Sequence, residues 1–167
     1  MNRLYFLFLF TLISCSNPNQ IGVVKNSDDL SLKLTTFINQ YVDESYESLD
    51  SIFSDSIHIN LNNRTYNSIS KLESGLKLYH NVYSDILIDS QSLCTFYLDD
   101  GRIKTFQKVN FITKNKITQK VGSIRALFEY EWSNSYVVEM SVIFDSETLT
   151  KEVNLFKNSL KNQLIGN

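Results

Sequence analysis

The stretch Val121–Asp145, VGSIRALFEYEWSNSYVVEMSVIFD, is the most informative part of the chain for the fold class. Two runs rich in β-branched and aromatic residues flank the polar triplet Ser133, Asn134 and Ser135. Such runs favour the pleated, half-buried surface of a strand, and serine and asparagine favour turns. We therefore predict that the stretch forms the central β-hairpin of a curved antiparallel sheet.

The segments on both sides of this hairpin show either helical or strand periodicity. Apolar residues spaced three and four apart predict helices at about 27–41, 46–53, 68–83 and 149–164. Alternating apolar residues predict strands at about 56–61, 85–89, 94–98 and 102–113. The order indicates an α+β fold in which a curved antiparallel sheet wraps around the N-terminal helices and a C-terminal helix follows. The short hairpin turns argue against a parallel sheet.

The first residues have the pattern of a secretory signal. Arg3 precedes the apolar run Leu4–Phe10, which is shorter than the roughly 20 residues needed to span a membrane. The ending Leu12, Ile13, Ser14 and Cys15 resembles a bacterial lipobox, in which the cysteine is lipidated and becomes the new N-terminus. This resemblance implies attachment to membrane lipid through Cys15, in the bacterial cell envelope and facing away from the cytoplasm.

The division of the chain follows from this pattern and from the composition. We expect a signal peptide at 1–14, a lipidated flexible tether at 15–27 that contains the only proline, and one folded domain at 28–165. The whole chain has 16 basic and 18 acidic side chains, and this balance argues against a nucleic-acid partner. Lipidation of Cys15 would leave Cys94 as the remaining cysteine, which excludes an intramolecular disulfide. Cys94 lies between apolar neighbours, so we expect a buried, inert thiol.

Several short motifs resemble those of a known superfamily. The segment Phe53–Ile57 is similar to the start of the first strand in nuclear transport factor 2-like domains. Thr113–Lys120, Ser135–Glu139 and Ile143–Asp145 resemble landmarks of the SnoaL-like branch. The chain departs from that branch at Gln119, where glycine is usual, and at Ser135 and Tyr136, which replace Gly-Lys. The resemblance spans about residues 28–160.

The resemblance implies a cone with an apolar pocket at its open end and often a homodimer formed through the sheet. Proteins of this kind are isomerases, cyclases, dehydratases or binding modules, so the fold alone does not choose the function. We expect five aromatic residues to line the pocket: Phe37, Tyr41, Phe53, Tyr79 and Phe128.

Asp145 is the first catalytic candidate, because it matches the position where polyketide cyclases of this branch carry an acid/base carboxylate. At an apolar pocket mouth, desolvation would raise its pKa and make it a proton shuttle. Asp145 also stands where a helix N-cap is wanted, and that role explains it equally well. The partner histidine of the cyclases has no counterpart in Val121–Trp132.

His58 is the second catalytic candidate, on the strand face opposite its isoleucine neighbours. The chain's other histidine, His80, is expected to be solvated on a helix. The two histidines lack metal-ligand spacing, so we predict no metal site and no cofactor.

Two functions remain open. The favoured one is a membrane-anchored, non-catalytic module that binds a small apolar ligand or a protein partner. The alternative is an acid/base isomerase or cyclase that uses Asp145. For the central strands, we expect Arg125, Glu129, Glu131 and Glu139 to face outward, because charged residues are rarely buried without partners.

Overall fold

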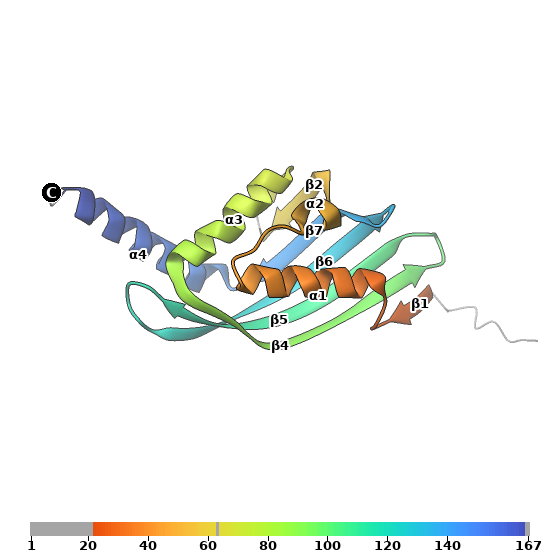
Figure 1. Ribbon diagram of the computed structural model, residues 1–167, viewed down its shortest axis with the longest axis horizontal. Helices are drawn as coiled ribbons and strands as arrows, with labels where there is room; N and C mark the ends of the chain where they lie inside the picture. Colours follow the sequence, from red (N-terminus) through yellow and green to blue (C-terminus); the bar gives the residue numbers. More distant parts are fainter. Residues whose placement is uncertain (1–21, 63, 166–167) are drawn as a thin grey trace, which may run out of the picture.

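The computed structural model describes residues 22–62 and 64–165, which form an α+β fold with one curved sheet (Figure 1). The helices are α1 (Asp29–Val42), α2 (Leu49–Ile52), α3 (Ile69–Val82) and α4 (Ser146–Ile165). The strands are β1 (Gly22–Lys25), β2 (Phe53–Leu61), β3 (Arg64–Tyr66), β4 (Tyr83–Leu98), β5 (Ile103–Asn115), β6 (Val121–Ser133) and β7 (Tyr136–Phe144). The predicted signal peptide and the predicted lipidation site Cys15 lie outside the described residues.

The predicted central hairpin is confirmed. Strands β6 and β7 pair antiparallel along most of their length. The strand order of the sheet is β1-β4-β5-β6-β7-β2-β3. Asn134 and Ser135 form the two-residue turn between them, with φ of 49° and 65°. Two consecutive positive φ values match the twist of paired strands, which is why such tight turns occur in hairpins.

The sheet contains one parallel pair, which the sequence analysis did not predict. Strand β2 pairs parallel with β7, with His58 to Leu61 opposite Glu139 to Val142 in the same direction, although the two strands are far apart in the sequence. Hairpin turns determine the direction only of strands that follow one another along the chain. The inference that short turns argue against parallel pairing therefore does not extend to β2 and β7.

A short strand that the sequence analysis did not predict precedes α1. Strand β1 lies in the segment expected to be a flexible tether and pairs with the end of β4, from Gly22 opposite Leu98 to Lys25 opposite Thr95. Gly22 is required here, since a Cβ atom would lie 2.1 Å from the carbonyl oxygen of Tyr97. A four-residue edge strand has too little periodicity to be recognised in a sequence. Residues 22–25 therefore belong to the sheet.

Helices α1, α2 and α3 lie over the inner face of the sheet (Figure 1). Helix α1 packs on β4, and α3 packs on β2 and β4. In β6 the inner side chains include Ala126, Tyr130 and Trp132, all buried, and the charged residues between them face outward as predicted. The core is therefore a single layer between the sheet and the helices. Its buried hydrophobic residues are drawn from several elements, the first along the chain being Leu34 and the last Leu149.

The N-terminus of α1 is held by Asp28. Its carboxylate accepts hydrogen bonds from the Ser31 backbone N–H at 2.7 Å and from the Tyr97 hydroxyl at 2.6 Å. Partial burial, the largest effect, raises the pKa of Asp28, but the hydrogen bonds from Tyr97 and Ser31 together lower it below its ordinary value. The carboxylate form is thus stabilised in the folded protein.

We expect Asp28→Ala to lower the free energy of unfolding by about 1 kcal/mol at neutral pH. The folded-state pKa lies below the unfolded value of about 3.9, so this contribution is complete above that pH and is lost as the pH falls through the folded-state pKa. Urea unfolding of both proteins between pH 7 and pH 3 should show the difference shrinking with acidification. Asp29→Ala, which removes a neighbouring carboxylate without a cap bond, is the control; equal losses for both variants would contradict the assignment.

Candidate ligand cavity

A cavity of about 330 Å³ lies between the inner face of the sheet and helices α1 and α3. Ligand pockets in proteins measure roughly 300–1,000 Å³, so this one suits a small molecule. Its inner wall is mostly apolar and comes from every strand between β2 and β7. The lining from this sheet includes Ile59, Leu61, Tyr66, Tyr83, Ile86, Phe111, Ile124, Ala126, Phe128, Met140, Val142 and Phe144.

Four of the five aromatic residues predicted for the pocket lie in its wall. Phe37 and Tyr41 come from α1, Tyr79 from α3 and Phe128 from β6. Phe53 does not line the cavity: its ring packs edge-on against Phe37, with centroids 5.0 Å apart, and the residue is almost completely buried. Phe53 is the first residue of β2 and directly follows α2. Its side chain lies in the core behind the cavity wall.

Several tyrosines contribute polar groups to this wall. Burial raises the pKa of Tyr79 to about 12 and raises those of Tyr41 and Tyr83 further. All three phenols therefore stay protonated near neutral pH and can act as neutral hydrogen-bond donors. Among the described residues, the hydroxyls of Tyr41 and Tyr79 have no hydrogen-bond partner, whereas the Tyr83 hydroxyl donates to the Glu152 carboxylate on α4.

The contact between Tyr83 and Glu152 fixes the start of α4 beside the cavity. Leu149, one turn earlier on α4, is buried and lines the cavity. The rest of α4 runs away from the sheet (Figure 1). Tyr83 was not among the residues predicted to line the pocket. Its spacing of four from Tyr79 on a predicted helix could have indicated that both side chains lie on the same face.

Asp145 lies outside the cavity and caps α4. It is exposed, and its carboxylate accepts from the backbone N–H groups of Glu147 and Thr148 at 3.1 and 3.3 Å and from the Thr148 hydroxyl at 2.8 Å. The Thr148 bonds hold the pKa of Asp145 below its ordinary value. A proton shuttle at an apolar mouth would have a raised pKa, so the condition for the predicted catalytic role is not met.

The two histidines also lie away from the cavity wall. His58 is exposed on the outer face of β2, next to Glu139 of β7. His80 is buried at 8% exposure, which corrects the prediction of a solvated side chain. Its Nε2–H donates to the Tyr41 carbonyl oxygen at 2.7 Å and so connects the C-terminal ends of α1 and α3.

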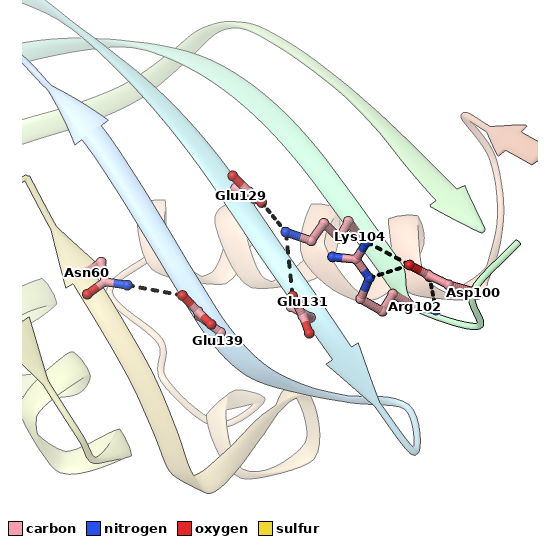
Figure 2. A network of polar contacts seen from close by, with 7 residues as sticks. All are labelled: Asn60, Asp100, Arg102, Lys104, Glu129, Glu131 and Glu139. Carbon is pink, nitrogen blue, oxygen red and sulfur yellow. Dashed lines mark hydrogen bonds and ion pairs between the residues drawn. The ribbon is translucent and has the colours of Figure 1, made fainter. Parts of the chain in front are cut away.

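The outer face of the sheet carries charged residues in register (Figure 2). Lys104 of β5 lies between two carboxylates of β6, with its Nζ 2.6 Å from Glu129 and 3.5 Å from Glu131. Asn60 donates to Glu139 at 3.1 Å across the parallel pair. Between these charges lie exposed apolar side chains, namely Phe106, Leu127 and Ile143. Cys94 belongs to this face and is half-buried, so the expectation of a buried thiol is wrong.

Two further features are absent from the part of the chain that the structure describes. Residues 22–62 and 64–165 contain no group of three or more His, Cys, Asp or Glu side chains placed to hold a metal ion. Within the same ranges, no helix is both long and apolar enough to cross a membrane.

Comparison with known proteins supports the fold and leaves the activity open. No protein-family model matches the sequence, and no curated protein is detectably related to it. A nuclear transport factor 2-like protein from Burkholderia xenovorans superposes with a TM-score of 0.60 at 11% identity, covering 77% of this chain and 99% of that one. The chain has the nuclear transport factor 2-like fold. This confirms the fold class predicted from the sequence.

Other solved structures with this fold have more specific descriptions. TerC, co-crystallised with polyporic acid, superposes with a TM-score of 0.58 at 10% identity and covers 75% of this chain and 98% of its own. A proposed polyketide cyclase from Xanthomonas campestris pv. campestris superposes with a TM-score of 0.58 at 8% identity, and the match covers 77% of this chain and 99% of that one. At such identities the likeness concerns the fold, and the function of this chain depends on its own side chains.

Proposed function

We propose that the protein is a membrane-anchored, non-catalytic module that binds a small, largely apolar molecule in its cavity. The observation that carries this proposal is the apolar cavity in which the hydroxyls of Tyr41 and Tyr79 have no hydrogen-bond partner among the described residues. Neither hydroxyl belongs to the completely buried polar atoms that lack a partner, so both remain accessible and can donate to an acceptor on a ligand. The co-crystal of TerC with polyporic acid supports the capacity of the fold to hold a ligand.

The anchor is the second part of the proposal. It rests on the lipobox-like sequence that ends at Cys15 and on the shortness of the apolar run before it. The test is Cys15→Ala in cells: the variant should leave the membrane fraction, and retention there with normal processing would contradict lipidation. The exposed apolar residues of the outer sheet face support a homodimer contact, which sedimentation at several concentrations tests.

An isomerase or cyclase of the SnoaL-like type is the alternative, favoured by the structural likeness to a proposed polyketide cyclase. Against it, the side chains that line the cavity include no Asp, Glu or His. Enolisation of a ketone needs a general base within hydrogen-bond reach of the proton it removes, and carboxylates and histidines are the usual bases. Binding without catalysis is therefore the better account of this wall.

The test of binding uses the chain from Gly22 onward, which contains the complete described core. Titration with the neutral fluorophore N-phenyl-1-naphthylamine should give saturable fluorescence enhancement with one site per chain. Bound ligand should also raise the unfolding temperature, since it binds only the folded state. Non-saturable enhancement without any change in unfolding temperature would contradict the proposal.

We expect Asp145→Ala to leave the affinity for this fluorophore unchanged and to lower stability through loss of the α4 cap. The measurement is the same titration, together with thermal unfolding of both proteins. A Glu147→Ala variant removes a neighbouring carboxylate of α4 and serves as the control for charge. Loss of fluorophore binding in Asp145→Ala alone would show that Asp145 does belong to the site.

A further inference from the structure

The side chains that are exposed among the lining residues mark where the cavity opens to solvent. Three of these are Arg64 on β3 and Lys71 and Ser74 on α3. Gly75 follows on the same side of α3, and an added Cβ there would meet no atom within 4 Å. The mouth of the cavity therefore lies between β3 and the first half of α3, and two cations border it.

No acidic side chain of the described residues neutralises these two cations at the mouth. Four other basic side chains of the domain are paired with carboxylates: Lys77, Arg102, Lys104 and Lys151. Among the described residues, neither the Arg64 guanidinium nor the Lys71 ammonium has an ion pair or a side-chain hydrogen bond. The charged side chains of the cavity lining are both positive, in a chain whose net charge is −2.

The position of Lys71 within α3 adds to this positive charge. Ser68 caps the helix by accepting from the Lys71 N–H at 3.3 Å, so Lys71 lies in the first turn. Free N–H groups make that end of a helix positive, and acidic side chains are favoured there. The first turn of α3 contains no acidic residue, so a lysine stands where helix stability would favour a carboxylate. Arg64 also acts on the cavity wall, because its charge partly offsets the rise in the pKa of Tyr79.

Building on the proposed binding function, we propose that the ligand is an amphipathic molecule with an aliphatic chain and an anionic head group. The chain would occupy the apolar interior, and a carboxylate or phosphate head would lie at the mouth between Arg64 and Lys71. Both cations can donate charge-assisted hydrogen bonds to such a head. A carboxylate head and a phosphate head share this chemistry, and the experiment below separates them.

The experiment displaces bound N-phenyl-1-naphthylamine with four competitors that each have a linear ten-carbon chain: decanoate, decyl phosphate, 1-decanol and decyltrimethylammonium. At least one of the two anions should displace the fluorophore at a concentration about tenfold lower than the alcohol, and the cation should be the weakest competitor. An apolar site without the two cations would prefer the alcohol, because an ionised head is costly to desolvate. The preference for anions should also decrease with added salt, since the mouth is exposed.

The double variant Arg64→Gln, Lys71→Gln identifies the groups responsible. It should abolish the preference for anions while leaving the concentration for half-displacement by 1-decanol within about twofold. Lys77→Gln is the matched control, because Lys77 lies on the same helix, is paired with Glu73 at 2.5 Å and does not line the cavity. This control should keep the preference for anions.

The outcomes separate the two proposals. Equal displacement by anions and alcohol, or a preference for anions that survives in the double variant, would overturn the anionic-ligand inference and leave the binding function intact. Failure of the fluorophore to bind at all would overturn the binding function itself. Preference for decanoate over decyl phosphate, or the reverse, identifies the head group.

Discussion

Replacing Phe53 with alanine is expected to lower the free energy of unfolding by about 3–5 kcal/mol, the range for deleting a fully buried aromatic ring. Phe53 is 1% exposed and packs edge-on against Phe37, in the core behind the cavity. Domains of this size are stable by about 5–15 kcal/mol, so the loss is a large fraction of the total. Urea unfolding at fixed pH measures it as a shift of the midpoint.

The matched control is Phe106→Ala, the same change on the outer face of the sheet. Phe106 is 42% exposed and contacts Phe96 edge-on, with centroids 5.5 Å apart. We expect a loss of at most about 1.5 kcal/mol, the upper range for an aromatic pair. Equal losses for the two variants would contradict the assignment of inner and outer faces. A loss for Phe106→Ala that grows with protein concentration would instead indicate a contact between two copies.

Enlarging Gly75 to phenylalanine is expected to weaken fluorophore binding by at least about tenfold without unfolding the protein. Gly75 lies at the mouth of the cavity, and a Cβ there meets no atom within 4 Å, so a large side chain can extend across the opening without a clash at its base. Glycine within a helix costs about 1 kcal/mol relative to alanine, so the substitution also removes a destabilising residue from α3. Fluorescence titration and thermal unfolding measure the two effects.

Gly75→Ala is the control that separates blocking from a change in helix stability. It should raise the free energy of unfolding by about 0.8–1 kcal/mol and leave the affinity for the fluorophore nearly unchanged, because one methyl group does not close the opening. If Gly75→Phe binds as tightly as Gly75→Ala, ligand does not enter between β3 and α3. If both variants lose binding, the flexibility of α3 matters more than the width of the mouth.

The elements with strong periodicity could be predicted from the sequence. The hairpin β6–β7, the helices α1 and α3 and the N-cap of α4 at Asp145 each depend on residues close in the chain, so local patterns are sufficient. Four of the five predicted pocket aromatics line the cavity, because inward-facing positions on a helix or strand follow from the same periodicity. Phe53 lies outside the cavity lining, because a buried position in a sequence pattern does not distinguish the cavity wall from the core behind it.

What the sequence by itself determined is the succession of helices and strands, the inner and outer faces of β6 and the class of fold. The tertiary structure decided the rest, because each remaining feature joins residues that are distant in the chain. Parallel pairing of β2 with β7 and the burial of His80 against Tyr41 depend on packing between separate elements. The cavity mouth likewise exists because the short strand β3 places Arg64 in the same cavity lining as Lys71 of α3, and no local pattern in the sequence marks a three-residue strand.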